Sequence, residues 1–296
     1  MKRTFTIALA LLLALSLAAC GGAPAASPSA SPSASPEVSP APSASASPAG
    51  GEPTELVIFA AASLTETLQQ IATMYAQVAP NVKLTFDFDS SGTLKTQIQE
   101  GADCDIFISA AQLQMDQLDI AAPDTVNTEK LDFVLEPTRI NLLENRVALV
   151  VPSGNPKNIN SFQDLADALS SGSVLMAMGN SDVPVGQYTQ KILKYYNLDE
   201  QALANAGHIT YGSNVKEVTT QVSEASVDCG VVYGTDAFSA GLDVVDYATA
   251  EMCGQVIYPA AVLKTSQNAD AAQAFLNYLT TDAAMSVFEG VGFTKP

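Results

Sequence analysis

Residues 56–78, LVIFAAASLTETLQQIATMYAQV, carry the pattern that decides the fold. The run at 56–60 is continuously apolar, which is typical of a strand buried on both faces of a parallel sheet. From 64 to 78, apolar residues recur every three or four positions, the spacing that places them on one face of a helix. This stretch therefore predicts one strand–helix unit of an α/β protein.

The same unit recurs toward the C-terminus. We expect further strands near 82–88, 105–109, 147–151, 174–178, 209–211, 230–233 and 256–263. We expect further helices near 93–100, 113–118, 162–169, 187–196, 216–225, 269–279 and 282–288. Strands and helices that alternate in this way predict parallel α/β sheets with right-handed crossovers. The sequence contains neither G-x-G-x-x-G nor a Walker-type loop, so a nucleotide-binding enzyme is not indicated.

The first residues of the chain predict export. Lys2 and Arg3 precede an apolar stretch at 5–17, which is too short for a permanent transmembrane helix of about 20 residues. The stretch ends in LAAC at 17–20, which resembles a bacterial lipobox. We therefore expect residues 1–19 to be a lipoprotein signal peptide and Cys20 to be the lipidation site. The alternative is an ordinary secretory signal in which Cys20 is incidental.

A Ser-, Pro- and Ala-rich segment follows Cys20 and extends to about residue 52. Such a composition cannot bury enough apolar surface to offset the entropy of ordering the chain. We expect residues 20–53 to be the lipidated cysteine and a disordered tether that holds a folded domain off the membrane. A glycosylated stalk is the rival interpretation of this segment.

The charge balance excludes one class of partner. The chain has 31 acidic and 13 Lys or Arg residues, a formal net charge of -18 at pH 7. An acidic chain without a basic run is not suited to bind nucleic acid. A local anion site remains possible, because salt screens exposed charges beyond about 10 Å.

Cysteine and histidine usage argues against a metal site. Apart from Cys20, the cysteines are Cys104, Cys229 and Cys253, and no C-x-x-C spacing occurs. An exported protein with these thiols can form one disulfide and keep one free cysteine, although the sequence does not choose the pair. His208 is the only histidine, so a catalytic Ser–His pair is not expected either.

Short blocks in a fixed order give the sequence its specificity. They read FAAASLT at 59–65, SSGTL at 90–94, GADCDIFISA at 101–110, VPVGQY at 183–188, VVYGTDA at 231–237, YPAAV at 258–262 and GF at 292–293. Together they resemble the molybdate-binding protein family, the extracytoplasmic component of molybdate ABC transporters. The resemblance covers essentially all of residues 56–293.

The resemblance implies a two-lobed α/β fold of the type II periplasmic-binding-protein class, with the ligand in a cleft between lobes joined by crossing strands. Lobe I would comprise residues 54–144 plus 258–296, and lobe II residues 145–257. The chain would be a monomer, lipid-anchored on the outer face of the cytoplasmic membrane, and would deliver its ligand to an ABC-transporter permease. It would need no cofactor, since molybdate or tungstate is its cargo.

The family's anion contacts correspond to Ser63, Ser91, Val185, Val215 and Tyr233. All but Tyr233 lie where our periodicity analysis starts a helix, and a helix start presents unpaired N–H groups and a positive dipole end to an anion. None of the five is Lys or Arg, so neutral donors would hold the dianion. A site with donors only would also reject an anion that still carries a proton.

Several residues have a plainer interpretation or depart from the family pattern. Ser63 and Glu66 fit a Ser-x-x-Glu capping box, and Ser91 fits a helix cap. Ala111 stands where many relatives have Asp, and Gly92 where some have Ser. Val185 replaces a frequent alanine, which leaves its backbone donor intact.

Other functions remain as alternatives. The first is a carrier for another tetrahedral oxyanion such as sulfate, and a more distant one is a surface adhesion lipoprotein. An enzyme is not expected, because the sequence offers no plausible pair of general acid and base.

Overall fold

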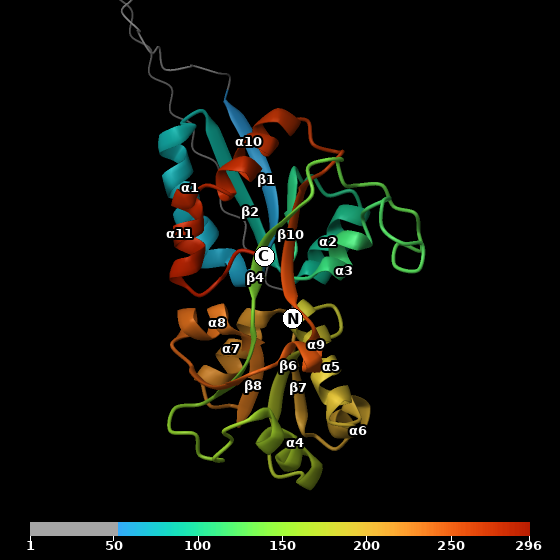
Figure 1. The fold of residues 1–296 in the computed structure, drawn as a ribbon, viewed down its shortest axis with the longest axis vertical. Helices are drawn as coiled ribbons and strands as arrows, with labels where there is room; N and C mark the ends of the chain where they lie inside the picture. Colours follow the sequence, from blue (N-terminus) through green and yellow to red (C-terminus); the bar gives the residue numbers. More distant parts are fainter. Residues whose placement is uncertain (1–52) are drawn as a thin grey trace, which may run out of the picture. The chain divides into compact units, whose positions relative to one another are not determined.

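The computed structural model describes residues 53–296, which contain two five-stranded sheets with helices packed against them (Figure 1). The expected signal peptide, Cys20 and the tether lie outside the described residues. Within them, no helix is long and apolar enough to cross a membrane.

The first sheet has the strand order β2-β1-β3-β10-β4. Its strands are β1 (Thr54–Ala61), β2 (Val82–Asp89), β3 (Ile106–Ile108), β4 (Ile140–Asn145) and β10 (Val256–Val262). β1 pairs in parallel with β2 and β3, whereas β10 runs antiparallel to β3 and β4. We call this sheet and its helices lobe I.

The second sheet repeats this arrangement in the order β7-β6-β8-β5-β9. Its strands are β5 (Val147–Val151), β6 (Met176–Gly179), β7 (Ile209–Gly212), β8 (Cys229–Tyr233) and β9 (Asp243–Tyr247). β6 pairs in parallel with β7 and β8, and β5 runs antiparallel to β8 and β9. We call this sheet and its helices lobe II.

Each lobe also contains helices. In lobe I they are η1 (Ala62–Leu64), α1 (Thr65–Val78), α2 (Ser91–Gln99), α3 (Gln112–Asp116), α10 (Ala269–Leu279) and α11 (Asp282–Gly290). In lobe II they are α4 (Phe162–Ser171), α5 (Pro184–Tyr195), α6 (Glu200–Asn205), α7 (Val215–Ser223), α8 (Gly234–Ala240) and α9 (Ala250–Cys253). In Figure 1, α1 and α11 lie on one side of the first sheet and α2 and α3 on the other.

The chain crosses twice between the sheets. Arg146 alone separates β4 from β5, and a segment containing α9 joins β9 to β10. The expected two-lobed α/β architecture is thus confirmed. The expectation of purely parallel sheets is wrong for β5 and β10, because each enters its sheet from the other lobe and not through a strand–helix–strand unit.

The core explains why β1 is continuously apolar from residue 56 to residue 61. Leu56 and Ile58 are fully buried in the cluster that contains Leu68 and Ile71 of α1. Phe59 points into a second cluster on the other face of the sheet. Both faces of the strand are covered, so a strand in which apolar and polar residues alternated would have buried polar side chains without partners.

The cysteines do not pair. Cys104, Cys229 and Cys253 are all free and buried. Cys104 belongs to the smaller core cluster of lobe I, whereas the other two belong to the larger cluster. The expectation of one disulfide is therefore wrong for the described residues.

Candidate functional site

A small cavity lies between the strand ends of lobe I and the helix starts of lobe II. Its volume is about 10 Å³, roughly the space of one water molecule. Four of the five predicted contacts line it, namely Ser63, Ser91, Val215 and Tyr233. The fifth, Val185, follows Pro184, which is itself a lining residue. No Lys or Arg is among the lining residues.

Ser63 lies within η1, the short helical turn that follows β1, and is 5% exposed. Its Oγ lies 3.0 Å from Tyr258 Oη of β10. Neither η1 nor α1 has a side-chain cap at its start. The capping-box interpretation with Glu66 is therefore wrong, because β1 passes directly into η1 and places Ser63 inside the turn. The hydroxyl is held by a crossing strand instead.

Ser91 is the first residue of α2 and is fully buried. The cap of this helix is Ser90, whose Oγ accepts a 3.1 Å hydrogen bond from the N–H of Thr93. Ser91 Oγ instead accepts a 2.9 Å hydrogen bond from the N–H of Ala110, just beyond β3. Our interpretation of Ser91 as a helix cap is thus wrong by one residue. Its side chain faces the rest of the cavity wall, not its own helix.

Two helices of lobe II begin beside the cavity. α5 begins at Pro184, which has no N–H, so Val185 supplies the first amide of that helix. α7 begins at Val215, after Asn214, whose Oδ1 accepts a hydrogen bond from the N–H of Glu217. A helix has no internal acceptor for its first-turn N–H groups, and its dipole is positive there. Such starts favour an anion.

Tyr233 ends β8 and is 2% exposed. Its Oη donates a 3.4 Å hydrogen bond to the carbonyl of Ala110, across the boundary between the lobes. Burial raises its pKa well above the usual value, so the phenol keeps its proton at neutral pH. Its ring contacts those of Tyr188 and Tyr258 at centroid distances of 6.4 and 5.7 Å. The hydroxyl is therefore a firmly placed donor.

Asp89, the last residue of β2, also lines the cavity. Its Oδ1 accepts hydrogen bonds from the N–H of Ser90 at 2.7 Å and from Nδ2 of Asn214 at 3.4 Å. Asp89 was not among the predicted contacts, although it directly precedes the SSGTL block. The cavity wall thus contains one carboxylate. The expectation that only hydrogen-bond donors would line the site is therefore wrong.

Polar contacts hold the lobes together around the cavity. The N–H of Gly92 donates to the carbonyl of Asp182 at 3.1 Å, and Nε2 of Gln114 donates to Oε1 of Gln187 at 3.2 Å. The Asp89–Asn214 and Tyr233–Ala110 bonds also join one lobe to the other. The structure therefore has the lobes closed.

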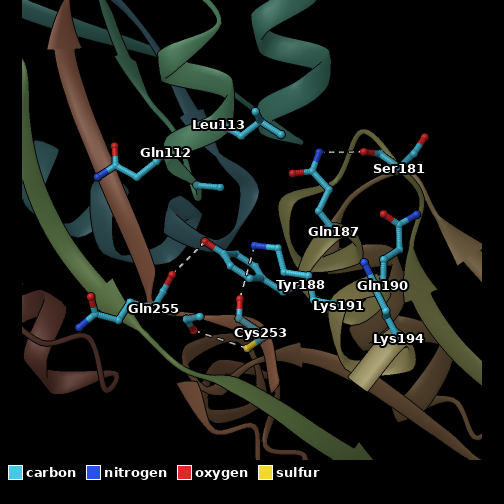
Figure 2. Close-up of a pocket in the computed structure, with 12 residues that line it drawn as sticks. Gln112, Leu113, Ser181, Gln187, Tyr188, Gln190, Lys191, Lys194, Cys253 and Gln255 are labelled. Atoms are coloured by element: carbon cyan, nitrogen blue, oxygen red, sulfur yellow. Dashed lines mark hydrogen bonds between the residues drawn. The ribbon is translucent and has the colours of Figure 1, made fainter. Parts of the chain in front are cut away.

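A larger groove of about 590 Å³ lies beside the cavity, between α3 and α5 (Figure 2). Several of its polar side chains are already engaged. Tyr188 donates to the carbonyl of Gln255 at 3.4 Å, and Lys191 donates to the carbonyl of Cys253 at 3.4 Å. None of the predicted contacts lines this groove. The small cavity, where the helix starts meet, is therefore the better candidate for an anion site.

A metal centre finds no support in the described residues. No group of three or more His, Cys, Asp or Glu side chains among residues 53–296 is placed to hold a metal ion. His208, the only histidine in the sequence, precedes β7.

Comparison with known proteins places the chain in a family. Residues 56–294 match the family model described as bacterial extracellular solute-binding protein. The Bacillus subtilis protein YvgL, whose name describes an ABC transporter substrate-binding lipoprotein, is 34% identical, with 81% of this chain and 86% of that protein covered. The molybdate-binding protein ModA of Haemophilus influenzae is 33% identical, with 81% of this chain and 90% of that protein covered.

A solved structure supports the fold. The periplasmic molybdate-binding protein of Azotobacter vinelandii aligns with a TM-score of 0.68 at 20% identity and covers 81% of this chain and 99% of its own. At this identity the match concerns the two-lobed fold alone. With the family model and both relatives matching over most of their lengths, the chain belongs to the bacterial extracellular solute-binding proteins.

Proposed function

We propose that this protein captures molybdate, and also tungstate, outside the cell and delivers it to an ABC-transporter permease. The observation that carries the proposal is the convergence of Ser63, Ser91, Val215 and Tyr233, from both lobes, on one closed cavity. The ModA name of a relative at 33% identity supports the choice of anion. Because the family binds solutes and does not transform them, the expectation that the chain is not an enzyme is confirmed.

Neutral donors are sufficient for a doubly charged anion. Each hydrogen bond to a charged acceptor contributes about 1.5–3 kcal/mol net. Several such bonds, less the cost of desolvation and lobe closure, are compatible with a Kd between about 1 μM and 1 nM. The first amides of α2, α5 and α7, at Ser91, Val185 and Val215, and the hydroxyls of Ser63, Ser91 and Tyr233 would supply these donors.

Capture requires movement of the lobes. A cavity of about 10 Å³ is buried behind contacts that join the lobes, so the anion must enter when these contacts are broken. Closure around the ligand then replaces the hydration shell with fixed dipoles, a hinge movement of the kind that periplasmic binding proteins undergo. The permease would bind the closed form, in which both lobes present one continuous surface.

We also propose the remaining features that our sequence analysis expects. Residues 1–19 would be removed, Cys20 would carry the lipid, and residues 20–53 would tether the monomeric domain to the outer face of the membrane. The name of YvgL supports the lipid anchor, and the family is extracellular. The lobe boundaries would lie at 144/145 and 257/258, near the two crossings.

The test uses residues 53–296, which contain both sheets and their cores. Ligand that binds only the folded state stabilises it by about 2.7 kcal/mol at a hundredfold excess over Kd. Thermal melts with molybdate, tungstate, sulfate and phosphate should show a clear rise in Tm for the first two anions and little or none for phosphate. A larger shift with sulfate than with molybdate would reassign the cargo to sulfate.

A further inference from the structure

Lys216, the second residue of α7, connects the two lobes. Its Nζ lies 2.9 and 2.8 Å from the two carboxylate oxygens of Glu66 on α1. The same Nζ lies 3.2 Å from Oδ1 of Asp236 on α8. Glu66 belongs to lobe I, whereas Lys216 and Asp236 belong to lobe II. One ammonium group therefore contacts a carboxylate of each lobe.

Asp236 makes this contact unusual. It is 1% exposed, and neither of its carboxylate oxygens has a hydrogen-bond partner among the described residues. The contact with Lys216 is thus an ion pair without hydrogen-bond geometry. A buried carboxylate is stable as an ion only when it is paired. Lys216 is the one cation in residues 53–296 that pairs with it.

The charge of Lys216 is secure. Burial acts to lower its pKa, but the charges of Asp236 and Glu66 outweigh this effect, and the pKa is raised. The ammonium group therefore keeps its proton at neutral pH and serves both carboxylates. Among the ion pairs of the described residues, the one with Glu66 is the only pair that joins the lobes.

The contacts of Lys216 with Asp236 and with Glu66 differ between the open and the closed state. Lys216 and Asp236 lie on neighbouring helices of one lobe, so their ion pair survives opening. The Glu66 contact exists only when the lobes are closed. An interaction that is made in one state and not in the other shifts the equilibrium toward that state. Of the two contacts that Lys216 makes with carboxylates, only the one with Glu66 can therefore favour closure.

We propose that Lys216 is a positioning residue for anion capture: its ion pair with Glu66 fixes the start of α7 against lobe I and slows the escape of the bound anion. Lys216 directly follows Val215, whose amide opens α7 beside the cavity. The ion pair thus holds one of the proposed donors in place without touching the ligand. This inference rests on the proposed function.

The test removes the bond between the lobes and spares Asp236. Glu66→Gln abolishes the charge on lobe I and leaves Lys216 paired with Asp236. In stopped-flow measurements on residues 53–296, the dissociation rate of molybdate should rise about two- to fivefold, while the association rate changes little. The effect should shrink as the salt concentration rises, because salt screens this partly exposed pair. The thermal stability of the ligand-free protein should stay unchanged.

Glu55→Gln is the matched control. Glu55 forms an exposed ion pair at 2.8 Å with Lys83, and both residues lie on lobe I. This variant loses an ion pair of the same kind and should release molybdate at the wild-type rate. Lys216→Arg, which keeps the charge, should release the anion more slowly than Lys216→Gln.

The outcomes separate this inference from the proposed function. If the wild type and Glu55→Gln bind molybdate, and Glu66→Gln releases it at the wild-type rate, the inference is overturned and the proposed function stands. If the wild-type protein binds none of the oxyanions, both are overturned. A selective increase in the dissociation rate of Glu66→Gln supports the inference.

Discussion

The N–H of Gly92, in the first turn of α2, donates a 3.1 Å hydrogen bond to the carbonyl oxygen of Asp182, in the loop before α5. This bond joins the two lobes at the rim of the cavity. A Cβ atom on Gly92 would lie 2.2 Å from that oxygen, a separation that real Cβ atoms essentially never show. The absence of a side chain at this position is therefore a condition of the closed state.

Gly92→Ala should block closure without harming the fold. Alanine stabilises a helix by about 1 kcal/mol relative to glycine, so the ligand-free protein should melt at the same temperature or higher. The clash with the backbone of Asp182 should weaken molybdate binding by at least about tenfold, that is about 1.4 kcal/mol. Calorimetric titration measures the affinity. Gly290→Ala is the control, because a Cβ there meets nothing within 4 Å; equal affinity of both variants would rule out the steric argument.

Removal of single hydroxyl donors should weaken binding without unfolding the protein. Ser91→Ala and Tyr233→Phe each delete one hydroxyl from the cavity wall, and the ring of Tyr233 keeps its contacts with Tyr188 and Tyr258. Each loss should cost about 1–3 kcal/mol of binding free energy. Tyr211→Phe, which removes an exposed hydroxyl bonded to Glu200, should bind as the wild type does. Wild-type affinity in both cavity variants would mean that the anion binds elsewhere.

Asp89→Asn should strengthen binding. The carboxylate lines the cavity, and its negative charge opposes a dianion there. The amide oxygen of asparagine can still accept from the N–H of Ser90 and from Asn214, which both use Oδ1. We expect molybdate affinity to rise by about three- to tenfold, with a larger gain at low salt. A loss of affinity in competition titrations would show that the charge of Asp89 supports the closed state.

Asp236 should make stability depend on pH. Burial raises its pKa to about 6 from the ordinary 3.8, although Lys216 acts in the opposite direction. The folded state thus holds this proton more tightly than the unfolded state. The resulting stabilisation is complete below about pH 4 and is lost as the pH rises through about 6.

Asp236→Asn removes this dependence, because asparagine is neutral at every pH. The stability of the variant relative to wild type should therefore increase from pH 4 to pH 7, by up to about 3 kcal/mol. Urea unfolding at pH 4, 5, 6, 7 and 8 measures the difference. A stability difference between variant and wild type that stays constant from pH 4 to pH 8 would contradict the raised pKa of Asp236.

The local spacing of apolar residues predicted those strands and helices whose own apolar side chains form the core. The apolar run of β1 and the three-to-four spacing of α1 follow from burial on both faces of a strand and on one face of a helix. α7 begins where Asn214 and the helical period place its start. β4 and β9 were not predicted, because neither edge strand is a continuously buried apolar run and both owe their order to pairing with β10 and β5.

Most of the side chains proposed to bind the anion were predicted to lie together, but their contacts with other residues were not predicted. The resemblance to the molybdate-binding family implied contacts at Ser63, Ser91, Val185, Val215 and Tyr233, and all of these except Val185 line one cavity in the structure. The role of Glu66 was misread, because its partner Lys216 lies 150 residues further along the chain. Contacts of this range come from the closure of the lobes, and no local pattern encodes them.

The central claim is that donors from both lobes hold the anion in the small cavity, and a crystal of residues 53–296 grown with molybdate tests it most directly. An anomalous difference map at the molybdenum edge should show one strong peak between Ser63, Ser91, Val215 and Tyr233. A peak in the groove between α3 and α5, or no peak in the protein at all, would contradict the claim.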